Sequence, residues 1–277
     1  MKKLLLLTLC LVGGTALFAQ DKRHNFEVAY EVSDYEYREP HMENTMSLGG
    51  VKQGVSVSYL RRSVRSAELN EQDRSFASVE FRYMTGDVDY DGSVCNWGSG
   101  VCWPNKSNNL TDYYFELALK TGWAFKLAQP LELWPYLGVG WRYLRNHLEE
   151  GGNAGYLRTS TYVYMPLGLQ LKYQAADSLK FSLSGEFDWL LSGQQYSDIP
   201  FTGGITNDQT QGYGVRAGLR ADWALSSWAS MFVEPFWRYW HVQNSEEVYL
   251  RMGGNLYAMR EPFNTTREYG VRVGFVF

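Results

Sequence analysis

Residues 267–277 read Arg-Glu-Tyr-Gly-Val-Arg-Val-Gly-Phe-Val-Phe. If this stretch is a strand, every second residue counted back from Phe277 lies on the same face. That face carries the apolar and aromatic side chains of Tyr269, Val271, Val273, Phe275 and Phe277. The opposite face is small or charged apart from Val276. A repeat of two belongs to a β-strand, and a lipid face opposite a small or charged face is typical of transmembrane barrels. The stretch therefore predicts the closing strand of an antiparallel transmembrane β-barrel.

The same strand resembles the C-terminal signal by which bacterial outer-membrane proteins are recognised for assembly. The resemblance makes the apolar face, from Tyr269 to Phe277, the recognised surface. It also implies the barrel assembly machinery as a partner during biogenesis and the bacterial outer membrane as the location.

The N-terminal segment is typical of a secretory signal peptide. Lys2 and Lys3 precede a mostly apolar run, and Leu17-Phe18-Ala19 is a plausible cleavage site. We expect residues 1–19 to be removed and residues 20–277 to form one barrel domain.

Composition supports the same class. Aromatic residues make up 16% of the chain although its mean hydropathy is −0.35. No apolar run after residue 20 is long enough for a spanning helix. The net charge of −4 and the lack of a basic stripe argue against nucleic acid as a partner.

Ten alternating segments follow the signal peptide, and eight or twelve strands remain open alternatives. The segments are roughly 24–38, 50–62, 75–88, 111–126, 134–147, 160–174, 179–192, 211–224, 229–242 and 267–277. Short connections should lie in the periplasm and long ones outside. The long connections 89–110, 193–210 and 243–266 fit outer loops, whereas 63–74 is unusually long for a periplasmic turn.

In these segments, many of the positions that should face the lumen hold charged residues, and acids and bases are nearly equal in number. They are Glu27, Glu31, Lys52, Glu80, Arg82, Glu116, Lys120, Arg142, Lys172, Glu186, Asp188, Arg216, Arg220, Glu234, Arg238 and Arg272. A ten-stranded barrel is narrow, so such charges should be paired. We expect an internal ion-pair network, with further filling by Tyr136, Tyr162, Tyr164 and Trp240. A selectivity filter or proton path is the alternative.

Asp87, Asp89 and Asp91 followed by Gly92 match the first half of a calcium loop. The twelfth position, where a bidentate glutamate belongs, is Gly98. We expect at most a weak divalent-cation site and no other cofactor.

Cys95 and Cys102 are the cysteines left after signal removal, with six residues between them in a polar stretch. In an oxidising compartment they predict a disulfide within an outer loop.

Several strings resemble those of a family of small bacterial outer-membrane barrels. They are YEYREP (35–40), GVGWRYL (138–144), VEPFWRYW (233–240) and NTTREYG (264–270). The resemblance implies an outer-membrane barrel domain and no particular substrate.

The chain also resembles omptins, ten-stranded outer-membrane proteases with an aspartate pair and an Asp-His pair at the outer rim. Asp87 and Asp89 loosely match the aspartate pair. The region of the second pair contains Asp198 and Asp208 but no histidine, and without that base the water is not activated as omptins do it.

We therefore expect a monomeric barrel with a plugged lumen, in contact with membrane lipid and lipopolysaccharide, whose outer loops carry a structural or surface-interaction role. Catalysis is not expected. A porin-like channel for small solutes or ions is the first alternative, and an omptin-like rim protease is the second.

Overall fold

A computed structural model describes residues 24–40, 46–63, 73–95, 101–152, 155–200, 202–252 and 254–277. The predicted signal peptide and most of the 63–74 connection lie outside these residues.

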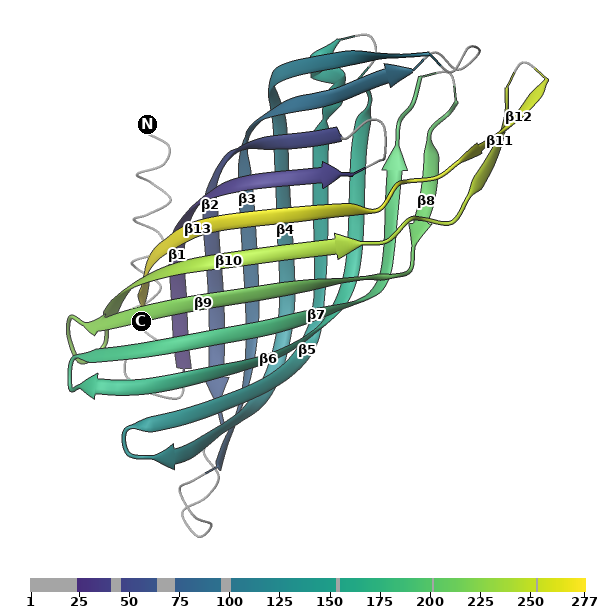
Figure 1. Ribbon diagram of the computed structural model, residues 1–277. Helices are drawn as coiled ribbons and strands as arrows, with labels where there is room; N and C mark the ends of the chain where they lie inside the picture. Colours follow the sequence, from purple (N-terminus) through teal and green to yellow (C-terminus); the bar gives the residue numbers. More distant parts are fainter. Residues whose placement is uncertain are drawn as a thin grey trace.

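Ten antiparallel strands close a barrel (Figure 1). They are β1 (His24–Glu39), β2 (Met46–Arg62), β3 (Asp73–Cys95), β4 (Cys102–Ala128), β5 (Leu131–His147), β6 (Leu157–Ala176), β7 (Leu179–Ser197), β9 (Gly212–Ala224), β10 (Ser230–Val242) and β13 (Asn264–Val276). Each pairs with the next in the chain, and β13 pairs with β1 to complete the circle. The predicted all-β barrel of ten strands is confirmed.

The closing seam extends to the last residue. The Phe26 backbone N–H donates to the Phe277 carbonyl at 3.0 Å, and the Phe277 N–H donates back at 2.8 Å. The face from Tyr269 to Phe275 points outward, with Tyr269 54% and Phe275 45% exposed. The face that resembles an assembly signal is therefore presented to the surroundings of the barrel.

Three segments predicted as outer loops are largely strand, so that prediction is wrong. β3 and β4 extend into 89–110, and β7 extends into 193–210, where it pairs with β8 (Ile205–Gln209). Within 243–266, β11 (Val248–Met252) and β12 (Asn255–Met259) form a hairpin that projects beyond the barrel (Figure 1). The one-turn helix η1 (Leu148–Gly151) follows β5. Outside the membrane both faces of a strand contact water, so the sequence need not alternate between apolar and polar residues. The signal that predicts membrane strands is therefore missing from these segments.

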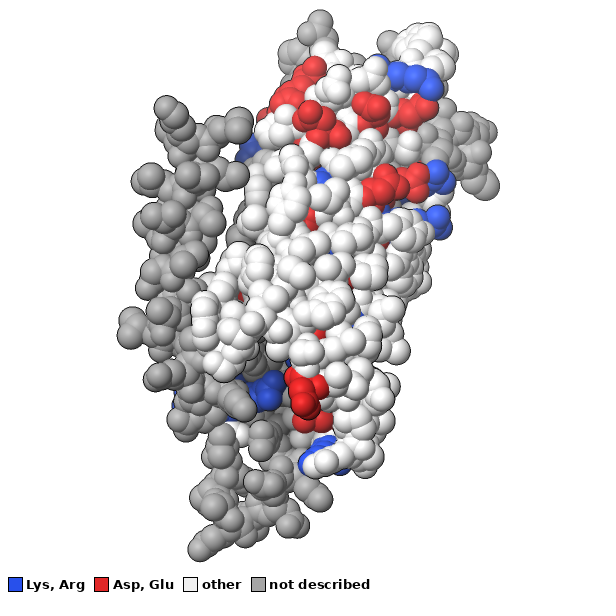
Figure 2. Space-filling view, turned by 90° about the vertical axis from the view of Figure 1, so that its left-hand side faces the viewer, with Lys and Arg blue, Asp and Glu red and all other residues white. Residues whose placement is uncertain are grey.

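The outer surface has the girdled pattern of a membrane barrel. Figure 2 shows charged side chains gathered toward the two ends and few between them. Outward-facing tyrosines lie toward the hairpin end, including Tyr83, Tyr113, Tyr143, Tyr213 and Tyr239. Exposed aromatics toward the short-turn end include Trp123, Tyr173, Phe181, Trp223 and Phe275. Leucines and valines such as Leu119 and Val139 lie between these girdles. No helix in the described ranges is long and apolar enough to cross a membrane.

The interior has three levels. Toward the hairpin end it is filled by what we call the outer plug, the buried apolar side chains Tyr35, Tyr37, Met46, Leu48, Val88, Leu110, Leu148, Tyr162, Tyr164, Leu190, Trp240 and Val242. Below it lies the charge layer, made of Glu31, Arg82, Glu116, Lys120, Arg142, Glu186, Asp188, Arg216, Arg238 and Glu268. A cavity of about 320 Å³, the vestibule, occupies the short-turn end.

Candidate functional site

Every second side chain of a strand points inward, and the predicted charges lie at these positions. All of the predicted lumen charges are buried in the interior or line the vestibule. The four aromatic fillers lie there too, with Tyr162, Tyr164 and Trp240 buried and Tyr136 packed against Trp134 at the short-turn end.

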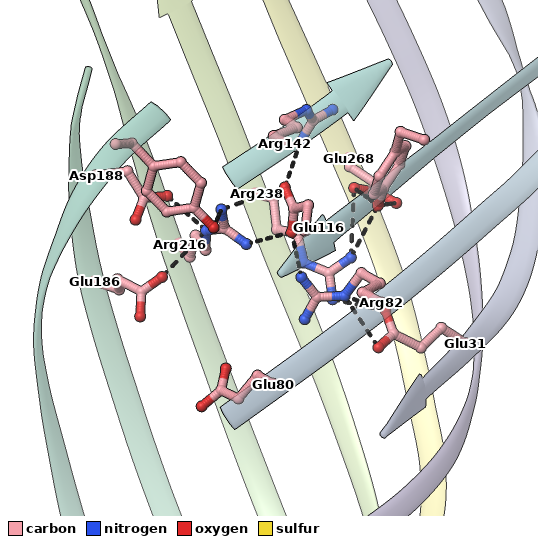
Figure 3. Close-up of polar contacts among 12 residues, drawn as sticks. Glu31, Glu80, Arg82, Glu116, Arg142, Glu186, Asp188, Arg216, Arg238 and Glu268 are labelled. Carbon is pink, nitrogen blue, oxygen red and sulfur yellow. Dashed lines mark hydrogen bonds and ion pairs between the residues drawn. The ribbon is translucent and has the colours of Figure 1, made fainter. Parts of the chain in front are cut away.

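Glu116 on β4 is the centre of the charge layer (Figure 3). Its carboxylate accepts from Arg82 at 2.6 Å, from Arg142 at 2.8 Å and from Arg216 at 2.8 Å. These arginines come from β3, β5 and β9, so one carboxylate ties both sides of the barrel together. Glu116 is 3% exposed and would be costly to bury without such partners.

A second carboxylate, Glu31 on β1, connects Arg82 at 3.2 Å and Arg238 at 2.7 Å. Arg238 also reaches Glu268 of β13 at 3.4 Å. Glu268 accepts from the Tyr114 hydroxyl at 2.8 Å and from Ser33 Oγ at 2.7 Å. Almost every oxygen on this side of the layer therefore has a donor.

The opposite side is held by Arg216. Its Nε lies 2.6 Å from Asp188 and 3.2 Å from Glu186. Lys120 then bridges Glu186 at 2.7 Å and Glu80 at 2.8 Å. The pairs form one continuous network across the lumen (Figure 3).

Two further arginines pair nearer the short-turn end. Arg220 contacts Glu27 and Asp222, each at 2.6 Å. Arg272 contacts Glu234 at 2.6 Å and Glu27 at 3.3 Å. These pairs form the wall between the charge layer and the mouth of the vestibule.

Several members near the hairpin end were not predicted from the sequence, namely Asp112, Asn146, Arg158, Glu39 and Glu261. Lys52 pairs with Asp112, which also accepts from Asn146 at 2.6 Å. Arg158 pairs with Glu39 and lies 3.5 Å from Glu261. Asp112 shares the inward parity of Glu116, so extending the alternation outward would have found it. Glu261 lies between strands, where parity gives no signal.

Glu261 also fastens the base of the β11–β12 hairpin. Its backbone N–H donates to Ser245 Oγ at 2.8 Å, and its carbonyl accepts from the Ser245 N–H at 3.0 Å. Burial and the neighbouring Glu39 raise the pKa of the Glu261 carboxyl to about 8, although Arg158 opposes the shift. A protonated Glu261 relieves the repulsion of two carboxylates that share one guanidinium.

The aspartates of the calcium-like motif are not brought together. Asp87 and Asp89 lie on β3 at outward parity and are exposed, while Val88 between them is buried in the outer plug. Asp91 pairs with Lys106 at 2.7 Å. Within the described ranges no three acid, histidine or cysteine side chains form a group that could hold a metal ion. The weak cation site predicted at Asp87, Asp89 and Asp91 stays a prediction.

An Asp-His pair of the omptin kind is absent from the described residues. His147 contacts Glu149 at 2.7 Å, His241 contacts Gln243 at 3.1 Å, and His24 contacts Tyr59. Asp208 accepts from Gln194 at 3.0 Å, and Asp198 accepts from Tyr196 at 3.3 Å. In these contacts none of the three described histidines has an aspartate as its partner.

The two cysteines lie at the ends of a long hairpin. Cys95 on β3 and Cys102 on β4 are directly opposite in the strand register. Opposed residues in an antiparallel pair are close enough for a disulfide. The predicted disulfide would therefore join the two strands at the end of the β3–β4 hairpin, not two positions within a long loop.

Comparison with known proteins supports the fold. No family model matches the chain, and no curated protein sequence matches it. The outer membrane protease OmpT from Escherichia coli is similar in structure, with a TM-score of 0.59 at 12% identity, over 93% of this chain and 97% of that one. At this identity the likeness shows the fold alone.

Two weaker structural matches are also outer-membrane barrels. The translocator domain of the autotransporter NalP from Neisseria meningitidis has a TM-score of 0.41 at 10% identity, over 96% of this chain and 94% of that one. The toluene transporter TbuX from Ralstonia pickettii has a TM-score of 0.40 at 8% identity, over 93% and 90%.

Proposed function

We propose that the protein is a bacterial outer-membrane barrel that is closed to solutes and acts at the cell surface through its hairpin end. The single observation that carries this proposal is the filled lumen. The outer plug and the charge layer occupy the interior on the hairpin side of the vestibule. If no solute passes through the barrel, its projecting hairpins are the parts that can contact other molecules.

The hairpins have side chains suited to binding. Trp103 on β4 is 52% exposed, and Tyr249 and Leu256 on the β11–β12 hairpin are each 62% exposed. All three lie beyond the outer aromatic girdle, where lipid tails do not cover them. Aromatic side chains are enriched where proteins bind one another, so a protein partner is favoured.

The channel and protease alternatives receive less support. A pore needs a continuous wet path, whereas the vestibule lining ends at Tyr164 and Arg238, beneath the outer plug. A rim protease of the omptin kind needs a histidine base beside an aspartate, whereas His147 and His241 contact Glu149 and Gln243. No described feature favours either activity.

The remaining partners follow from the surface. The apolar belt suits membrane lipid, with lipopolysaccharide at the hairpin side, and the barrel closes within a single chain, so a monomer is sufficient. The exposed face of β13 is proposed as the surface that the barrel assembly machinery recognises.

Photo-crosslinking in intact cells tests the proposal. A benzophenone amino acid at Tyr249 should give adducts with protein. The matched control is Tyr173, which is 47% exposed at the opposite end and should give no protein adduct of the same mass. Identical adducts at both positions, or none at Tyr249, would contradict a binding role for the hairpin.

A further inference from the structure

The vestibule is a cavity that the proposed surface role does not use. It has a volume of about 320 Å³, and its lining runs from Tyr164 and Arg216 at mid-barrel to Arg62 and Lys180 near the short turns. The Lys180 side chain is 37% exposed. Known small-molecule sites begin at about 300 Å³, so the cavity is large enough for a small organic molecule.

One wall of the vestibule has an ordered row of donors. Lys172 on β6 lies directly opposite Ser182 on β7, and Ser182 lies directly opposite Arg220 on β9. All three side chains line the cavity. Side chains directly opposed on neighbouring strands have Cβ atoms about 5 Å apart, so one ligand group can contact the whole row.

Lys172 has no acid within ion-pair distance among the residues described. Its Nζ lies 3.3 Å from the centre of the Trp134 ring, and the Arg62 guanidinium lies 4.6 Å from the same ring. Lys180, Arg62 and Arg220, all of like charge, are near Lys172, and Asp222 is the acid near it.

Two acids near this row have contacts of their own. Glu132 lies opposite Lys172 in the register and accepts from the Trp134 indole N–H at 2.9 Å. Asp222 accepts from Arg220 at 2.6 Å and lies 3.9 Å from Lys180. Lys172 therefore lines the cavity as a cation that no described acid pairs with.

We propose that the vestibule is an anion-binding site that takes a phosphate monoester, with Lys172, Ser182 and Lys180 as its donors. Phosphate has the charge and the acceptor oxygens that this row lacks. The cavity leaves room for the organic part of the ligand beside Tyr136 and Gln170, which also line it. The ligand enters from the short-turn side, because the outer plug covers the other end.

The phosphate monoester can come from a soluble ester or from a lipid, since glycerol 3-phosphate and phosphatidic acid present the same group. Glycerol 3-phosphate is the probe for the first source, with glycerol as its uncharged match. Phosphatidic acid added to phosphatidylcholine bilayers is the probe for the second. If the site takes a lipid headgroup, the added lipid should weaken the binding of glycerol 3-phosphate. If the site takes only a soluble ester, glycerol 3-phosphate should bind with the same affinity in both bilayers.

Isothermal titration of the refolded chain in phosphatidylcholine bilayers tests the site. Glycerol 3-phosphate should bind saturably and glycerol should not. Lys172→Met should weaken binding about tenfold, the value expected for losing one charge-assisted hydrogen bond. Lys106→Met, which removes a 68% exposed lysine on the outer hairpin, should leave affinity unchanged.

Methionine keeps the aliphatic bulk over the Trp134 ring, and heat-modifiable gel mobility reports whether each variant is folded. Lys180→Met at the accessible mouth is the second variant should Lys172→Met fail to fold, and it too should weaken binding. Absence of saturable binding to the wild type, or equal affinity in wild type and folded Lys variants, would overturn the proposal.

Discussion

The two ends of the barrel interior are built from the same strands but filled differently. Toward the hairpins, Leu48 and Val242 are fully buried and Trp240 is 2% exposed. Toward the short turns, Lys172, Ser182 and Arg220 line an open cavity. Since strand geometry is the same at both ends, the choice of inward side chain alone decides whether the lumen is closed or hydrated. The barrel is therefore accessible from one side.

Packing inside the narrow lumen depends on small residues opposite large ones. Gly140 on β5 lies opposite Tyr164 on β6, and a Cβ at residue 140 would lie 2.1 Å from the tyrosine ring. The ring lies flat against the wall only because residue 140 is glycine. This arrangement brings Tyr164 under Trp240, at 5.3 Å between ring centres, where the outer plug meets the charge layer.

Glu116→Ala is the strongest test of the boundary between the two ends. The change leaves Arg82, Arg142 and Arg216 without their shared carboxylate, and removing one partner of a buried pair costs about 3–5 kcal/mol. Urea unfolding in lipid vesicles measures the loss. Glu246→Ala, an exposed change on the hairpin side, is the control and should cost under about 0.5 kcal/mol. A similarly small loss for Glu116→Ala would mean that water already fills the charge layer.

Leu48→Ala tests the outer plug itself. Leu48 has no exposed surface, and the cavity left behind should destabilise the barrel by about 3 kcal/mol. The matched control is Leu256→Ala on the projecting hairpin, where the leucine is 62% exposed. Equal unfolding free energies for the two variants would show that the plug is not packed.

The anchoring of the hairpin should depend on pH. The pKa of Glu261 is about 8 in the folded chain and near 4.5 when unfolded, so the folded state binds this proton more tightly. Stability from this group is present at low pH and is lost as pH rises to 8. Between pH 6 and pH 9 the anchoring of the hairpin should therefore weaken.

Amide hydrogen exchange at Ser245 and Glu261, corrected for the intrinsic pH effect, measures this change. Glu261→Gln keeps a neutral side chain at every pH and should remove the dependence. A wild-type hairpin with the same protection at both pH values would argue against a protonated Glu261 beside Glu39.

The smallest effect is expected from the cysteines. Mass spectrometry of the non-reduced peptide should show Cys95 linked to Cys102. Because the bond closes a short hairpin outside the plug and the charge layer, its reduction should leave the unfolding midpoint of the barrel unchanged. Two alkylated thiols in protein from an oxidising compartment would rule out the bond.

The alternation of the strands allowed the fold and the lumen charges to be predicted from the sequence. The same alternation would have predicted the direction of Asp87. Arg82 points inward, so Asp87, five residues later on the same strand, points outward. The partners within the network were not predictable, since they depend on barrel tilt and closure. Tyr114 and Glu268, for example, are 154 residues apart. Glu261 was missed because it lies between strands, and the long hairpins were missed because polar strands resemble loops.

Single-channel recording in planar bilayers tests the closed lumen most directly. The refolded wild-type protein should insert without producing stable conductance steps, because the outer plug and the charge layer fill the lumen beyond the vestibule. Insertion is verified independently by heat-modifiable mobility of protein recovered from the same membranes. Reproducible, ion-selective steps from the folded wild type would contradict the account and establish a channel.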